Sequence, residues 1–170
     1  METFDICVIG GGPAGYAAAM RALDFNKKVL MIEKDRVGGA GLYNGALSSK
    51  TLWELSKDVF MARKRVNKFS QNSGFELDFE QVKRELHDAV KERGEFLERH
   101  LEGLKSSGYR NLFYLKNGSA KLISKNEVSI TDKTGNVEVV FADNIVLATG
   151  SSPRKLPNIP IDEKIIVTSD

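Results

Sequence analysis

The stretch FDICVIGGGPAG, residues 4–15, decides the fold of this chain. Its first six residues form a mostly apolar run that is typical of a buried parallel strand. The glycines that follow predict a tight turn, and the alanine-rich residues 16–25 predict a helix. A second apolar run, residues 29–32, ends at Glu33. This order of strand, glycine turn, helix, strand and acid indicates a βαβ unit that holds a dinucleotide.

The glycines of such a unit have separate tasks. Gly10 permits the sharp exit from the strand, Gly12 lets a pyrophosphate approach the backbone, and Gly15 lets the helix pack closely on the strand. The N-terminus of the helix then faces the phosphates with its free N–H groups. Glu33 would accept hydrogen bonds from ribose hydroxyls and repel a 2′-phosphate. The alternative is a glycine turn without a ligand, which the ordered strand, helix and acid disfavour.

Composition agrees with an α/β domain. The chain has 170 residues, a net charge of +2 and 28% charged residues. Its overall charge is too small to indicate binding to nucleic acid or to a membrane. The one concentrated basic run, residues 63–65 with Lys68, predicts a solvated face late in a helix. No apolar run approaches the ~18 residues of a membrane span, and the acidic N-terminus is unlike a secretory signal. We therefore expect a cytoplasmic protein without disulfides, whose one cysteine, Cys7, lies in the core.

The rest of the chain predicts two long helices and a set of strands. A glycine-rich loop, residues 38–45, precedes a helix that reaches about Phe69, with its apolar side expected at Trp53, Leu55, Val59, Phe60 and Val66. A second helix is expected from Asp78, which with Gln81 resembles a capping box. Its apolar stripe would comprise Val82, Leu86, Val90, Leu97, Leu101 and Leu104, with His87 and His100 exposed. Residues 111–141 predict a β-meander, and residues 145–148 predict a last buried strand.

The segment GGAGLYNGALSSK, residues 38–50, resembles the redox-active segment G-G-T-C-x-x-x-x-C-x-P-S-K of the pyridine nucleotide-disulfide oxidoreductases. This is the family of dihydrolipoamide dehydrogenase and glutathione reductase. Thr149 and Gly150, at the end of the last predicted strand, resemble the family's second FAD motif. The resemblance implies that the dinucleotide is FAD. It also implies a Rossmann-like FAD-binding α/β domain with a parallel sheet, long helices and a β-meander.

The same resemblance implies cofactor-binding residues, and neither a catalytic nor a metal-binding residue in this part of the fold. Ala120 would offer backbone groups to the adenine, Glu33 would meet the adenosine ribose, and Lys50 would lie by the isoalloxazine. The alternative for Lys50 is an ordinary solvated lysine. The expected set is Gly10, Gly12, Pro13, Ala14, Gly15, Glu33, Lys34, Gly39, Ala40, Lys50, Ala120, Thr149, Gly150 and Ser151.

The departures from the family pattern concern its chemistry. Gly41 and Ala46 stand where the family has its two cysteines, Ala40 replaces the threonine and Ser48 replaces the proline. Disulfide exchange needs a thiolate and a resolving partner, so dithiol chemistry should be absent. Electrons would then go to a non-disulfide small-molecule acceptor: a quinone, a nicotinamide or oxygen. Gly41 would leave room for a planar acceptor over the flavin face.

The resemblance also predicts how the chain is divided. Residues 1–151 would form the FAD-binding domain, and residues 152–170 would form a linker toward an NAD-binding domain outside this chain. The full-length protein would use NAD(P)H and form a homodimer, whereas these residues alone would bind FAD more weakly and show no NAD(P)H-driven turnover. Two functions stay open: part of a flavin-dependent oxidoreductase, or a non-catalytic FAD-binding or interaction module.

Overall fold

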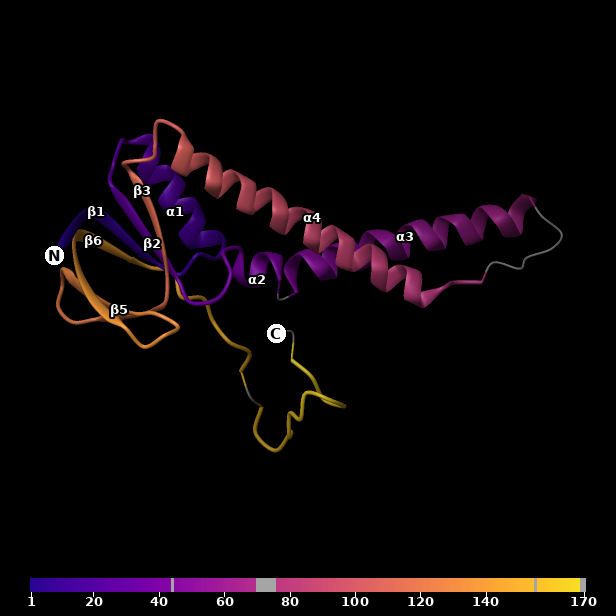
Figure 1. Cartoon of the computed structure of the whole chain (residues 1–170). Coiled ribbons are helices and arrows are strands. Elements are labelled where there is room, and N and C mark those ends of the chain that lie inside the picture. Colours follow the sequence, from indigo (N-terminus) through magenta and orange to yellow (C-terminus); the bar gives the residue numbers. More distant parts are fainter. Residues whose placement is uncertain (44, 70–75, 155, 169–170) are drawn as a thin grey trace.

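The computed structural model describes residues 1–43, 45–69, 76–154 and 156–168 of the chain. These residues form a mixed α/β domain from which a long helical hairpin projects (Figure 1). The strands are β1 (Glu2–Ile9), β2 (Val29–Glu33), β3 (Phe113–Asn117), β4 (Ser119–Leu122), β5 (Glu127–Thr131) and β6 (Val137–Leu147). The helices are α1 (Pro13–Asp24), α2 (Gly39–Leu42), α3 (Ala46–Phe69) and α4 (Phe79–Ser106).

The strands form one sheet in the order β3-β2-β1-β6-β5-β4. Strand β1 pairs in parallel with both β2 and β6, with Cys7 opposite Leu30 on one side and Ile145 on the other. Strand β3 pairs in parallel with β2. The carboxyl ends of these strands therefore meet at one edge of the sheet, which is where ligands bind in open α/β sheets.

Both faces of the parallel strands are covered, and for this reason β2 is buried along its whole length. Helices α1 and α4 cover one face, where Val8, Met31 and Phe113 meet Leu23 and Leu101. The β-meander covers the other face in a second core, formed by Phe4, Cys7, Ile9, Leu30, Ile32, Val128, Ile130, Val140 and Ala142. The expected fold class, including its long helices and its meander, is thereby confirmed, and Cys7 lies in the core as predicted.

Three details differ from the expectation. Strand β3 belongs to the parallel sheet and not to the meander, because it pairs with β2. Strand β6 is one strand where two were expected. The side-chain amide of Asn126 donates to the carbonyls of Ala142 and Asp143, and so supports the backbone where the two expected strands join. The glycine-rich loop contains the short helix α2, which follows Gly38 with φ +117°. A helix this short shows no periodicity in its sequence.

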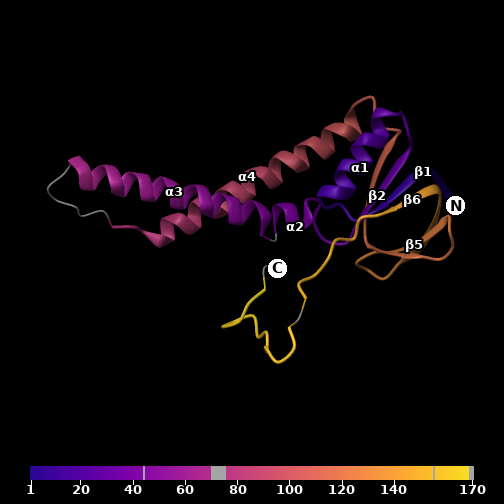
Figure 2. The same cartoon turned by 180° about the vertical axis from the view of Figure 1, so that it is seen from behind.

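The helices α3 and α4 pack on each other as a hairpin that extends away from the sheet (Figures 1 and 2). The half-buried residues of α3 are Leu47, Ser48, Thr51, Leu55, Val59, Ala62 and Val66. Trp53 and Phe60 were expected on that side, but at 100° per residue they point away from it. Asp78 is the N-cap of α4, and its carboxylate accepts the N–H groups of Glu80 and Gln81. The side chain of Gln81 contacts Glu85 instead of the cap, so only half of the capping box forms. Within the described residues, each helix is too short or too polar to span a membrane.

Candidate dinucleotide site

The glycine loop leaves the carboxyl end of β1 and leads into α1. Gly10 has φ +102°, and a Cβ there would overlap the carbonyl oxygen of Ala148. A Cβ on Gly15 would overlap the carbonyl oxygen of Gly10, so the fold itself requires both glycines. A Cβ on Gly12, by contrast, would meet nothing within 4 Å. The loop therefore presents bare backbone at the N-terminus of α1, a cradle that a phosphate group would fit.

Glu33 lies at the end of β2 and is 9% exposed. One carboxylate oxygen accepts the N–H of Gly11 at 2.7 Å, and the other accepts the N–H of Asp35 at 2.9 Å. These bonds fix the glycine loop to β2, a task that the sequence pattern did not reveal. Because each carboxylate oxygen has two lone pairs, Glu33 keeps acceptor capacity for ribose hydroxyls.

Helix α2 lies against the glycine loop. The N–H of Gly38 donates to the carbonyl of Gly11 at 2.8 Å, and a Cβ on Gly39 would stand 3.2 Å from the Cα of Gly12. A Cβ on Gly41 would overlap the ring of Pro13. Pro13 thus fills the space where a Cβ of Gly41 would stand, and the room that Gly41 would leave over a flavin face stays a prediction. Sequence reasoning could not detect this contact, since it depends on how α2 docks on α1.

A hollow of about 240 Å³ opens between the loop, α2 and α4. Its lining comprises Gly12, Pro13, Tyr16, Gly38, Gly41, Leu42, Arg93 and Leu97. Arg93 is the charged residue of this lining, and it comes from the middle of α4. The hollow adjoins the N-terminus of α1, so Arg93 brings a positively charged residue to the region where phosphates are expected. No motif in the sequence pointed to Arg93, because it lies far along the chain from the glycine loop.

The remaining expected residues lie at several places. Thr149, Gly150 and Ser151 follow β6 at the edge of the sheet that holds the loop, and a Cβ on Gly10 would stand 3.2 Å from the Thr149 nitrogen. Lys34, next to Glu33, is exposed, and Ala14 and Ala40 are exposed beside the loop and in α2. Ala120 lies on β4 opposite Ile130, and Lys50 is exposed near the start of α3. Their cofactor roles stay predictions.

This chain has no reactive thiol. Cys7 is its only cysteine and is fully buried. Burial raises the pKa of its thiol to about 11, so the thiolate is absent at neutral pH. His87 and His100 are exposed as expected, and the ring of His100 packs edge-on against Tyr16.

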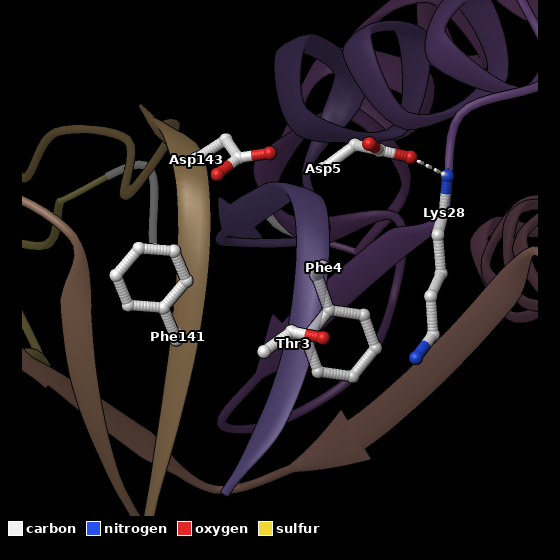
Figure 3. A pocket seen from close by; sticks show the side chains of 6 residues that line it. All are labelled: Thr3, Phe4, Asp5, Lys28, Phe141 and Asp143. Atoms are coloured by element: carbon white, nitrogen blue, oxygen red, sulfur yellow. Dashed lines mark hydrogen bonds between the residues drawn. The ribbon is translucent and has the colours of Figure 1, made fainter.

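A second hollow, of about 350 Å³, lies away from the glycine loop, near the amino-terminal half of β1 (Figure 3). Asp5 and Asp143 line it from neighbouring strands. The carboxylate of Asp5 accepts the N–H of Lys28 at 2.6 Å, and the Lys28 ammonium lies over the rings of Phe4 and Tyr114. These groups fix the start of β2 and shield its core, so we assign this hollow no ligand.

Comparison with known proteins agrees with this geometry. The family model described as pyridine nucleotide-disulphide oxidoreductase matches residues 4–169. The chain is 35% identical over 99% of its length to the mitochondrial dihydrolipoyl dehydrogenase of Dictyostelium discoideum, of which it covers 33%. It is 38% identical over 97% of its length to mitochondrial dihydrolipoyl dehydrogenase 1 of Arabidopsis thaliana, of which it covers 32%.

Among solved structures, LpdA from Mycobacterium tuberculosis superposes with a TM-score of 0.77 at 22% identity, over 98% of this chain and 35% of that one. This likeness shows the fold. The family match shows more: the chain belongs to the pyridine nucleotide-disulphide oxidoreductase family. It spans about a third of the length of the curated relatives named above.

Proposed function

We propose that this chain is the FAD-binding part of an NAD(P)H-dependent oxidoreductase that passes electrons to an acceptor other than a disulfide. The observation that carries the proposal is the open backbone at Gly12, beside the buried carboxylate of Glu33 and the N-terminus of α1. A pyrophosphate needs close backbone approach and a ribose needs an acid, and this edge of the sheet offers both.

The residues of the site have distinct proposed roles. Gly12 and the N–H groups of the first turn of α1 bind the pyrophosphate, and Arg93 adds a positive charge at the adjoining hollow. Glu33 orients the adenosine ribose and selects against a 2′-phosphate on it. Thr149 and Gly150 line the middle of the cofactor, and Lys50 supplies charge near the isoalloxazine. The flavin supplies hydride acceptance and one- or two-electron transfer, and the protein supplies position and electrostatics.

The proposal of a non-disulfide acceptor rests on the thiols. A family-type exchange needs two cysteines in the segment 38–50, whereas Gly41 and Ala46 occupy their positions. Cys7 cannot replace them, because it is buried and its pKa is about 11. A quinone, a nicotinamide or oxygen accepts electrons from a flavin without a protein thiol. We propose that the whole protein works in this way, as a cytoplasmic homodimer that uses NADH or NADPH.

A second candidate is a non-catalytic FAD-binding or interaction module. The replacement of both family cysteines by Gly41 and Ala46 favours it, because a module without a redox role has no need of them. The two candidates share the dinucleotide site and differ in turnover. Binding of FAD therefore tests their common part, and activity of a longer reading frame separates them.

The test of the common part uses Gly12→Val. We expect the unchanged chain to bind FAD saturably and NAD weakly or not at all, as followed by flavin fluorescence and calorimetry. The Gly12→Val chain should fold normally, since a Cβ meets nothing within 4 Å, yet lose at least about tenfold in FAD affinity because the side chain fills the pyrophosphate cradle.

Gly103→Val is the matched control, because Gly103 in α4 also has nothing within 4 Å of an added Cβ. It should leave FAD affinity unchanged. Equal affinity of the Gly12→Val and unchanged chains would contradict the proposed site, and failure of a folded unchanged chain to bind FAD would contradict the proposed function.

A further inference from the structure

Helix α4 contains two glycines, Gly94 and Gly103, whose surroundings differ. A Cβ on Gly103 would meet nothing within 4 Å, whereas Gly94 is buried. A Cβ on Gly94 would stand 3.0 Å from the hydroxyl oxygen of Tyr43 and 3.7 Å from two carbons of its ring. Glycine is less favourable than alanine inside a helix, so a buried one usually has a packing reason. The close approach of Tyr43 is such a reason.

Tyr43 directly follows α2, and its side chain contacts both the turn before α2 and the middle of α4. On the side of the turn, a Cβ on Gly38 would stand 3.3 Å from the ring, and the guanidinium carbon of Arg36 lies 5.5 Å from the ring centre. On the side of α4, the hydroxyl reaches Gly94. The N–H of Tyr43 donates to the carbonyl of Gly39 at 2.9 Å, which ties the residue to the backbone of α2. The ring therefore sets how closely α2 and α4 approach each other.

Helix α2 in turn holds the backbone of the glycine loop. The N–H of Gly11 donates to the carboxylate of Glu33, and the carbonyl of Gly11 accepts the N–H of Gly38. A Cβ on Gly39 would stand 3.2 Å from the Cα of Gly12, so the two backbones are in contact. A shift of α2 would therefore move the peptide groups that the proposed pyrophosphate site uses.

We propose that Tyr43 is a positioning residue for FAD, and that residue 94 is a glycine because the Tyr43 hydroxyl needs the space beside it. The Tyr43 side chain holds α2 against the glycine loop, at a position that α4 determines. Residues 38–50 contain no cysteine, so no disulfide within this segment can hold α2 instead. The inference rests on the proposed FAD site, and it adds that the affinity for FAD depends on a contact made outside the loop.

The test exchanges one heavy atom for another at this contact in the 170-residue chain. Gly94→Ala adds the Cβ, and Tyr43→Phe removes the hydroxyl. In the double variant the Cβ would meet only ring carbons, at an ordinary contact distance of 3.7 Å. Calorimetric titration with FAD gives the dissociation constant of each chain. We expect Gly94→Ala to weaken FAD binding at least about threefold, and the double variant to bind within about twofold of the unchanged chain.

Gly103→Ala is the matched control, because it adds the same methyl group to the same helix without a neighbour. It should leave the affinity for FAD unchanged. Thermal unfolding without FAD separates positioning from stability, since alanine favours the helix at both positions and a loss of affinity in Gly94→Ala would not follow from a weaker helix.

Tyr43→Ala gives a second, independent measurement. Removal of the ring should weaken FAD binding, because α2 loses its contact with α4. In that background Gly94→Ala should have no further effect, since the added Cβ then displaces nothing.

Two results would overturn this inference alone. One is equal affinity of Gly94→Ala and the unchanged chain, which would mean that the ring moves aside without disturbing the site. The other is a loss in Gly94→Ala that Tyr43→Phe does not restore, because the Cβ would then act through another neighbour. Failure of the folded, unchanged chain to bind FAD would overturn the proposed function together with the inference.

Discussion

At the scale of single residues, the glycines of the loop differ in what an added side chain would meet. Gly15→Ala places a Cβ against the carbonyl oxygen of Gly10 and forces α1 away from β1. We expect it to lower the free energy of unfolding by roughly 1–3 kcal/mol or more, measured by urea titration. Gly103→Ala in α4 should raise it by up to about 1 kcal/mol, because alanine favours a helix interior. Equal stability of the two variants would contradict the packing described for Gly15.

Cys7 gives a prediction for alkaline pH. Burial raises the pKa of its thiol from an ordinary value of 9.0 to about 11. Between these values the unfolded chain releases the proton and the folded chain keeps it. The free energy of unfolding therefore decreases with rising pH by about 1.4 kcal/mol per unit over this window, and Cys7 has no such effect below pH 9.

Urea unfolding at pH 8.5 and pH 10.5 measures this effect, with Cys7→Ala as the reference that keeps every other titrating group. The unchanged chain should lose about 2 kcal/mol more than Cys7→Ala between the two pH values. Equal losses would mean that the thiol titrates alike in the folded and unfolded chains.

The sequence was sufficient to predict the roles of Gly10 and Gly15. These roles follow from a local pattern, because strand, turn and helix are consecutive in the chain. The overlap of Gly41 with Pro13 and the approach of Arg93 to the loop do not follow from such a pattern. Both depend on the docking of α2 and α4, which are separated from the loop in sequence.

At the scale of elements, the turn between β5 and β6 is closed by one carboxylate. Asp132 accepts the N–H groups of Thr134 and Asn136 at 2.8 and 2.9 Å, and the Thr134 hydroxyl and Asn136 amide also donate to it. The hydrogen bonds of these two residues lower the pKa of Asp132 to about 2. Because the folded pKa lies below the unfolded one, the turn is supported above pH 4 and loses this support as pH falls through about 2.

NMR titration of the Thr134 and Asn136 amide groups tests this prediction. Their shifts should move with a midpoint near pH 2 in the unchanged chain. The Asp132→Asn chain should show no such midpoint. A midpoint near pH 4 would mean that the carboxylate does not close the turn in solution.

The long elements of the fold were predictable, and their relations were only partly so. The stripe of α4 from Val82 to Leu104 has the helical period over many turns and packs as expected. On α3 the apolar residues lie on two sides, and sequence alone could not tell which side meets α4. Trp53 and Phe60 lie on the exposed side. Which apolar side of α3 becomes core is decided only by its packing against α4.

At the scale of the whole molecule, the sequence carries one glycine fingerprint, whereas the proposed reaction needs two dinucleotides. Hydride transfer from NAD(P)H to a flavin requires both groups in contact, and residues 10–15 form the one glycine fingerprint at a strand end in this sequence. We therefore expect the purified 170-residue chain, loaded with FAD, to show no sustained oxidation of NADH or NADPH with a quinone or dichlorophenolindophenol. Bound FAD should nevertheless raise the melting temperature, because it binds only the folded state. Free FAD is the control for background, and Gly12→Val is the control for the site. Turnover above that background which Gly12→Val abolishes would show that the nicotinamide reaches this flavin without a site of its own, and the division of tasks between two dinucleotide sites would be wrong.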